Sequence, residues 1–381
     1  FRDDAFVPLP GKYPFRGPVH FTWDKKREIG FSSPRLETAF GTIELNGNVD
    51  VSRAYDISIK GTISDVKASR EFTELVLRET IDIPEIRGSG DADVLIGGDI
   101  HSPRVKINFD LSPAGYDLFD VSAAQGTVEL ADKTVRGLFL VNDPEMKGEI
   151  QLFSQNKNLT ARIELPEGSV QRVLKGLDLK APLTGSASGD FELHSAPERL
   201  EVDGTFSSPL LNLAGFDLRE ATGKLNWDGD FLSLSDLVFT LYSGRVKGSC
   251  RLGFKSRHIG LDFIAEKADL SLLAPSLAGE LSLSLKGAGA IGGEIASGDF
   301  AVTGLHFGPF QTVDAQGNLK VKVSEETLGL STSGNFLPGE NSFSVDANIP
   351  LSGDELNLDL KGSFGNLDIL MPWKGAKGKL N

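Results

Sequence analysis

Apolar and polar residues alternate with a period of two along most of this 381-residue chain. Clear examples are Leu281–Lys286, Asn318–Ser324, Phe343–Ile349 and Glu355–Lys361. Because successive side chains of a β-strand point to opposite faces, each of these segments has one apolar face and one polar face. The pattern predicts a long antiparallel sheet with a single continuous apolar surface.

Turn residues separate the predicted strands. They include Gly97–Gly98, Asp228–Gly229, Gly292–Gly293, Pro338–Gly339 and Ser352–Gly353. Pairs of this kind are typical of tight turns between antiparallel strands. The spacing of the turns predicts about 25 strands.

Three segments repeat a common pattern: a short apolar stretch with helical spacing, a proline and a closing glycine. They are Thr73–Gly88, Ser169–Gly185 and Lys267–Gly279, and their closing glycines lie 97 and 94 residues apart. We expect the few short helices of the chain in these segments. The repeat predicts an irregular N-terminal segment, followed by four consecutive β units. These parts comprise residues 1–30, 31–87, 88–184, 185–278 and 279–381.

The predicted fold class is therefore all-β. We expect an elongated, curled antiparallel sheet built from repeated units of about 100 residues. Three arrangements bury one apolar face of a sheet: packing on a second sheet, closing into a barrel, or remaining an open trough that holds an apolar occupant. Because the predicted strands continue along nearly the whole chain, the pattern favours the open trough.

Composition narrows the function classes. The net charge of −14 argues against binding to the phosphates of DNA or RNA and against electrostatic adhesion to anionic lipid headgroups. The single cysteine, Cys250, cannot form an internal disulfide. No apolar run is long enough for a membrane-spanning helix. The chain begins at Phe1 without a signal peptide, and we expect a processed piece whose targeting segment lies outside it.

Two motifs resemble ligand sites but lack the required context. Gly287–Gly292 matches a dinucleotide-binding fingerprint, yet Glu294–Thr303 is predicted to be a strand rather than the helix that would bind the phosphate. Arg87–Asp99 resembles a calcium-binding nonapeptide repeat, but its aspartate is out of register by one and no tandem copy follows. Neither motif predicts a cofactor or a metal ion.

Residues suited to catalysis are scattered. The histidines lack metal-ligand spacing to one another and to Cys250, which lies within the predicted strand Val246–Phe254. The carboxylates lie on the polar faces of the predicted strands, where contact with solvent explains their presence. We therefore expect neither an enzyme nor a cofactor. The five histidines are His20, His101, His194, His258 and His306.

The candidate functional residues are the apolar members of the clearest alternating strands. An acyl chain is a natural occupant of an open apolar trough. We expect these side chains to form a water-free apolar surface together, so that no single residue is essential. An ordinary packed β core is the alternative interpretation. The predicted lipid-binding residues are Leu225, Trp227, Leu232, Leu234, Phe239, Leu241, Val246, Ile259, Leu261, Phe263, Leu281, Leu283, Leu285, Leu319, Val321, Val323, Phe343, Val345, Leu356, Leu358 and Leu360.

Three segments carry a resemblance to a known family. Phe40–Asp50, Ala268–Gly287 and Leu225–Gly248, the last ending in a Gly-Arg-x-x-Gly turn, resemble the AsmA-like envelope proteins, particularly the TamB branch. The likeness covers most of residues 30–381. It implies a periplasmic β-groove in a diderm bacterium, held at the inner membrane by an anchor outside this chain. It also implies phospholipid movement between the inner and outer membranes, outer-membrane biogenesis, and an outer-membrane barrel protein as partner.

Two other hypotheses compete with the lipid conduit. One is a structural or adhesive β-solenoid, or an envelope assembly factor, whose own side chains fill its interior. The other is a carbohydrate-active enzyme on a β scaffold, which is disfavoured because the chain has only 3 Trp and 4 Tyr and no evident acid pair.

Overall fold

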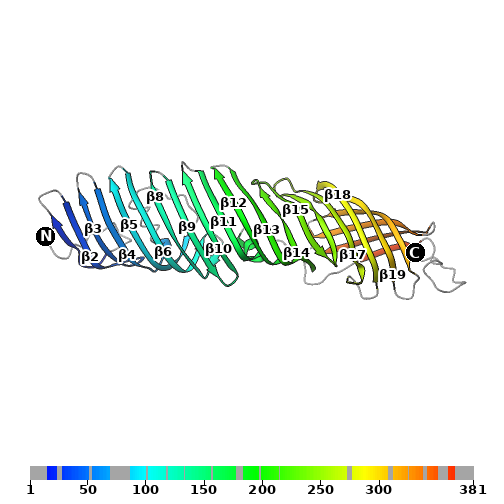
Figure 1. Ribbon diagram of the computed structural model, residues 1–381, viewed down its shortest axis with the longest axis horizontal. Helices are drawn as coiled ribbons and strands as arrows, with labels where there is room; N and C mark the ends of the chain where they lie inside the picture. The colour runs from blue at the N-terminus through cyan, green and yellow to red at the C-terminus, as the bar shows by residue number, and fades with distance from the viewer. Residues whose placement is uncertain are drawn as a thin grey trace. The chain divides into compact units, whose positions relative to one another are not determined.

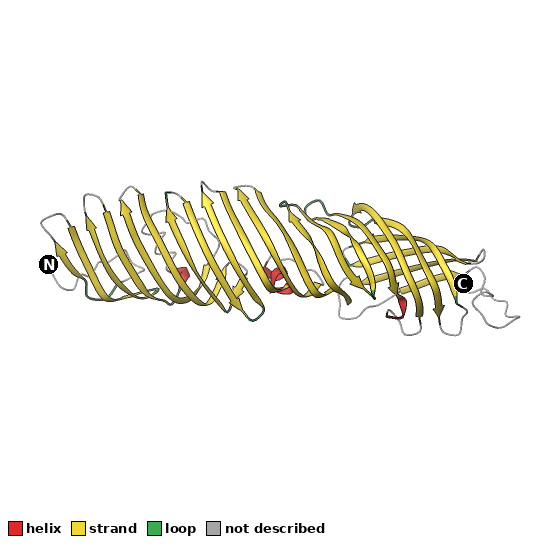
Figure 2. Ribbon diagram, in the orientation of Figure 1, coloured by secondary structure: helices red, strands yellow, loops and turns green. Residues whose placement is uncertain are grey.

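The computed structural model describes residues 15–23, 28–50, 54–68, 86–99, 102–116, 119–132, 134–155, 158–176, 183–196, 199–213, 215–272, 277–307, 312–324, 326–337, 341–350 and 359–364. Strands dominate these ranges, and short helices are few (Figure 2). The predicted all-β class is confirmed. The chain divides into two compact units: unit 1 comprises residues 1–180 and 190–198, and unit 2 comprises residues 181–189 and 199–381. The predicted division into four units stays a prediction.

Unit 1 is an antiparallel meander in which strands pair with their neighbours in sequence (Figure 1). The exception is β6, which pairs with both the short β7 and β8. The strands are β1 (His20–Trp23), β2 (Glu28–Thr38), β3 (Gly41–Asp50), β4 (Ala54–Ile63), β5 (Ile86–Asp99), β6 (Ser102–Tyr116), β7 (Phe119–Val121), β8 (Ala123–Ala131), β9 (Thr134–Asp143), β10 (Met146–Gln155) and β11 (Asn158–Ser169).

Unit 2 continues the same pattern, with every strand from β13 to β23 paired antiparallel to the next. Strand β12 (Leu183–Ala196) is divided between the two units. The strands are β13 (Arg199–Leu213), β14 (Phe216–Trp227), β15 (Phe231–Leu241), β16 (Gly244–Gly253), β17 (His258–Asp269), β18 (Leu277–Ala290), β19 (Glu294–Phe307), β20 (Val313–Val323), β21 (Thr327–Leu337), β22 (Asn341–Pro350) and β23 (Asp359–Phe364).

Two of the three repeated segments contain the short helices predicted for them. Helix α2 (Val170–Gly176) has seven residues, and η1 (Leu270–Leu272) is a single turn of 3-10 helix. In the remaining repeated segment, residues 73–85 lie outside the described residues and Ile86 begins β5. None of the helices in the described ranges has the length and apolar character that a membrane crossing requires.

Other local predictions have mixed outcomes. Asp228–Gly229 and Gly292–Gly293 lie in turns as expected, and the segment after the second turn is strand β19 rather than a helix. Gly97–Gly98 was wrongly predicted as a turn: both glycines are in β5, where they pair with Arg104 and Pro103. Glycine can occupy the last positions of a strand, so a pair of glycines does not by itself show where a strand ends. Pro338–Gly339 and Ser352–Gly353 lie outside the described residues.

The sheet of unit 2 curls. In Figure 1 the orange strands that follow β19 pass behind the yellow strands at a different slope. Two phenylalanines three strands apart, Phe300 on β19 and Phe343 on β22, have ring centroids only 6.1 Å apart. Adjacent strands are about 4.8 Å apart, so three spacings on a flat sheet would separate the two backbones by about 14 Å. The rings meet because they lean towards each other, which a concave face favours.

Candidate functional site

Strand register places the predicted lipid-binding residues of unit 2 on one face. Residues directly opposite each other in an antiparallel pair project to the same side of the sheet. One row of opposed residues crosses eight strands, from β15 to β22, without a charged side chain. It consists of Phe239, Val246, Ala265, Leu283, Phe300, Gly317, Gly334 and Phe343.

Neighbouring rows hold most of the other predicted residues. One row consists of Leu225, Leu234, Cys250, Leu261 and Gly287, and another of Trp227, Leu232, Leu252, Ile259 and Gly289. A third row consists of Gly248, Phe263, Leu285, Gly298, Leu319, Thr332, Val345 and Gly362.

The remaining predicted residues of unit 2 join the same face at its ends. Leu241 opposes Gly244, Leu281 opposes Ala268 and Val302, Val321 opposes Ala296 and Leu330, and Val323 opposes Leu328. Leu360 belongs to β23 and opposes Ala347, whereas Leu356 and Leu358 lie outside the described residues. We call this surface of β14–β23 the unit 2 apolar face.

Most side chains of the unit 2 apolar face are partly exposed, and a minority are buried. Leu285, Ile295, Ala296 and Val321 form one buried cluster, and Val302, Val313, Ala315 and Phe336 form a second. The opposite face carries charged pairs such as Lys286 with Asp262 and Lys224 with Asp236. The sheet therefore has one apolar face and one solvated face, as the alternation predicted.

Unit 1 has an equivalent surface that the sequence reasoning did not assign. Its central row crosses β3, β4, β5, β6, β8, β9, β10 and β11 and contains only apolar residues. We call the surface around this row the unit 1 apolar face. The signal was available, since Thr42–Val49 and Val105–Leu111 alternate as clearly as the segments of unit 2. The row consists of Leu45, Ile59, Val94, Ile107, Val128, Gly137, Leu152 and Ala161.

Phenylalanine rings cover glycines on both apolar faces. Gly126 opposes both Phe109 and Phe139, whose ring centroids are 5.7 Å apart although a strand separates them. In unit 2, Phe239 and Phe263 have centroids 6.5 Å apart across β16. The missing side chain of a glycine leaves room for a ring from the neighbouring strand, which links the high Gly and Phe content to one structural role.

Cys250 lies within the unit 2 apolar face, between Leu234 and Leu261. Burial raises the pKa of its thiol to about 11, so the thiol is neutral near pH 7. This environment fits the predicted role of a small apolar packing residue. Among the described residues, no group of His, Cys, Asp and Glu side chains could hold a metal ion.

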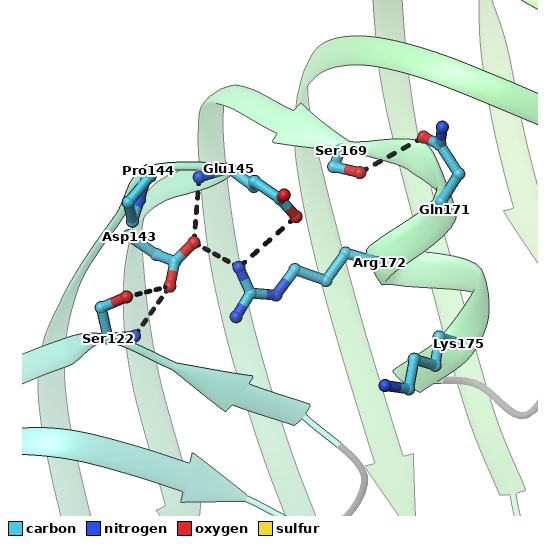
Figure 3. Close-up of a pocket in the computed structure, with 8 residues that line it drawn as sticks. All are labelled: Ser122, Asp143, Pro144, Glu145, Ser169, Gln171, Arg172 and Lys175. Carbon is cyan, nitrogen blue, oxygen red and sulfur yellow. Dashed lines mark hydrogen bonds and ion pairs between the residues drawn. The ribbon is translucent and has the colours of Figure 1, made fainter.

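A polar hollow of about 490 Å³ lies in unit 1, beside helix α2 (Figure 3). Asp143 lines it, is buried at 2% exposed, and forms an ion pair with Arg172 of α2. Asp143 also accepts hydrogen bonds from the Ser122 backbone and hydroxyl, each 2.7 Å long, and from the Glu145 backbone at 2.9 Å. Arg172 donates a further hydrogen bond to the Asp120 carbonyl. We call this arrangement the Asp143–Arg172 clasp.

Burial alone would raise the pKa of Asp143. The hydrogen bonds from Glu145 and Ser122, together with the positive charge of Arg172, outweigh it and lower the pKa to about 2. The carboxylate is therefore ionised at neutral pH and fixes α2 against the β7–β8 and β9–β10 connections. No local sequence pattern predicts this clasp, because Asp143 and Arg172 are 29 residues apart and meet only through strand pairing.

Comparison with known proteins found no relative. No family model matches the chain, and neither a curated protein nor a solved structure matches it.

Proposed function

We propose that the two apolar faces shield the acyl chains of phospholipids and conduct these lipids between the inner and outer membranes of a diderm bacterium. The supporting observation is the register, which gathers the apolar residues of successive strands on one face in each unit. Helices α2 and η1 are too short to cover such faces. A large apolar surface of this kind on a soluble protein is characteristic of an interaction site.

The energetic benefit of such a surface for a lipid is large. Exposing hydrocarbon to water costs about 0.8 kcal/mol per methylene, so two tails of about 16 carbons face a barrier of roughly 25 kcal/mol in water. A continuous apolar face lowers this barrier without any bond-making step. The proposed activity therefore needs no nucleophile, metal ion or cofactor.

The cellular setting comes from the resemblance to the AsmA-like and TamB-like envelope proteins. We propose a periplasmic location, an inner-membrane anchor outside this chain, a role in outer-membrane biogenesis and an outer-membrane barrel protein as partner. Phospholipid movement along the apolar faces requires none of these partners in vitro, so it is testable separately.

A structural β-solenoid or assembly factor with a self-filled interior is the second candidate. The contact between Phe300 and Phe343 above Gly317 and Gly334 favours it locally, because those rings fill part of the apolar face themselves. The two buried clusters of unit 2 have the same effect. Partial exposure of most other residues on this face favours the lipid conduit.

A transfer assay between vesicles separates the two functions. The test variant is Ile107→Asp, which puts a charge in the central row of the unit 1 apolar face. The matched control is Asn108→Asp, which adds the same charge one residue away, where Asn108 accepts a hydrogen bond from Thr127 on the opposite face. Movement of a fluorescent phospholipid between vesicles is measured with equal amounts of each folded protein.

We expect the wild-type chain and Asn108→Asp to accelerate transfer, and Ile107→Asp to lose most of that acceleration. Circular dichroism and the midpoint of urea unfolding establish that both variants are folded. Equal transfer by the two variants, or none by the wild-type chain, contradicts the conduit. Unfolding caused by Ile107→Asp alone favours a packed core.

A further inference from the structure

The polar hollow beside α2 lies at the margin of the unit 1 apolar face. Side chains alternate along β9, so Phe139, Val141 and Asp143 point to the same side of the sheet. Asp143 opposes Met146, and Val141 opposes Gly148. Phe139 and Val141 are apolar, and the next residue on the same side of β9 is Asp143. The apolar side of β9 therefore ends at the carboxylate of the Asp143–Arg172 clasp.

Two residues that line the hollow are followed or preceded in sequence by residues of an apolar cluster. Val121 immediately precedes Ser122, and Met146 immediately follows Glu145. Both belong to a hydrophobic cluster built on Leu111, Ala114 and Val121. Because Met146 opposes Asp143, this apolar cluster begins beside the charged lining of the hollow. The hollow is lined by Ser122, Asp143, Pro144, Glu145, Ser169, Gln171, Arg172 and Lys175.

The hollow offers one charge of each sign to a ligand. Asp143 and Arg172 largely satisfy each other, and the Arg172 side chain is 25% exposed. Glu145 is 66% exposed and lies 3.7 Å from Arg172. The exposed Lys175 makes no ion pair among the described residues, and Figure 3 shows its ammonium group directed towards the hollow. The accessible groups are thus a carboxylate and an ammonium.

We propose that this hollow binds the zwitterionic headgroup of a phospholipid whose tails lie on the unit 1 apolar face, an inference that rests on the proposed function. Lys175 pairs with the phosphate, and Glu145 accepts hydrogen bonds from the terminal primary ammonium. The Asp143–Arg172 clasp holds the Lys175 and Glu145 side chains at the margin of the unit 1 apolar face. An anionic headgroup gains less, because it leaves Glu145 beside its negative charge.

Native mass spectrometry with defined lipids tests the headgroup site. The intact chain is mixed separately with phosphatidylethanolamine, phosphatidylglycerol and diacylglycerol of matched acyl chains, and with soluble glycerophosphoethanolamine. The test variant is the double substitution Lys175→Ala, Glu145→Gln. The control is Lys147→Ala, Glu167→Gln, a pair of opposed residues on β10 and β11.

We expect the wild-type chain and the control to bind phosphatidylethanolamine most tightly. Since exposed ion pairs contribute little individually, the test variant should lose about fivefold in affinity for phosphatidylethanolamine. It should bind diacylglycerol as the wild-type chain does, because its apolar face is unchanged. Soluble glycerophosphoethanolamine should bind far more weakly than the lipid.

Other outcomes overturn the inference in distinguishable ways. Equal binding of phosphatidylethanolamine and diacylglycerol by the wild-type chain rejects the headgroup site but leaves acyl-chain shielding in place. Preference for phosphatidylglycerol rejects the zwitterionic class. Glycerophosphoethanolamine binding as tight as that of the lipid rejects tail anchoring. Failure to bind any of the three lipids rejects both the headgroup site and the proposed function.

Discussion

Glycine and phenylalanine act together in this protein. A Cβ atom added to Gly334 would lie 2.4 Å from the backbone carbonyl oxygen of Gln316 and 2.9 Å from the Cζ atom of Phe343. The Phe343 ring also contacts Phe336, with ring centroids 4.8 Å apart. By contrast, a Cβ atom on Gly260 would meet its nearest atom at 3.7 Å, an ordinary contact. These two glycines of unit 2 therefore differ in function although both lie within strands.

We predict that Gly334→Ala destabilises the chain by about 1–3 kcal/mol, because both the Gln316 backbone and the Phe343 ring must move from their packed positions. Gly260→Ala should be nearly neutral or slightly stabilising, since alanine reduces the entropy of the unfolded chain. Urea unfolding followed by circular dichroism measures both. Equal effects of the two substitutions would show that the close approach of Gln316 and Phe343 to Gly334 contributes little to stability.

The sequence correctly predicted which face of the sheet the apolar residues occupy. The reason for this success lies in the alternation of single residues along each strand. A period of two leaves each strand only one choice of face, so Leu281, Leu283 and Leu285 had to lie together. Irregularities were not predictable in this way. Between Leu234 and Leu237 the strand contains a bulge, with Asp236 at a φ of 51°, and the bulge keeps both leucines on the same face.

At the scale of elements, one four-residue sequence occurs once in each unit with the same serine contact. Phe31–Pro34 and Phe206–Pro209 both have the sequence Phe-Ser-Ser-Pro. In each case the second serine is buried and its hydroxyl donates to a backbone carbonyl, Ser33 to Pro18 and Ser208 to Ser186. Proline removes a backbone donor, and the hydroxyl of the preceding serine supplies another donor beside it.

The Asp143–Arg172 clasp provides a pH-dependent test of how α2 is held. The pKa of Asp143 is lowered to about 2 in the folded state, so the clasp contributes stability above the unfolded-state pKa near 3.8. That contribution is lost as the pH falls through about 2 and the carboxylate becomes protonated. Asp143→Asn removes the charge at every pH.

We predict that Asp143→Asn lowers the free energy of unfolding at pH 7 by about 1–3 kcal/mol, the cost of leaving charged hydrogen-bonding partners unsatisfied. The difference from the wild-type chain should shrink as the pH falls from 4 to 2. Urea unfolding at several pH values measures it. A difference that is constant over this range would mean that the Asp143 charge does not stabilise the clasp.

At the scale of the whole molecule, alternation specified the all-β class and the two-faced sheet but not the contacts that depend on pairing. Short apolar stretches correctly predicted short helices in two repeated segments, and α2 has seven residues and η1 three. Their stability comes from packing, as with the Arg172 contact and the position of Leu270 against the Val302 cluster. Such long-range contacts have no local signature in a sequence.

The central claim is that the apolar faces carry lipid, and native mass spectrometry of the purified chain with analysis of its organic extract tests it most directly. Leu283→Asp places a charge on the unit 2 apolar face, where Leu283 opposes Ala265 and Phe300. Ser284→Asp adds the same charge at an exposed position of the opposite face. Val321 is less suitable because it is buried within a cluster, and its substitution would disturb folding.

We predict several co-purified phospholipids per chain for the wild-type protein and for Ser284→Asp. Leu283→Asp should lose them while keeping the circular dichroism spectrum of the folded chain. A lipid-free mass for the wild-type protein after gentle purification, or equal lipid in the two variants, would contradict the account and favour a self-filled structural protein.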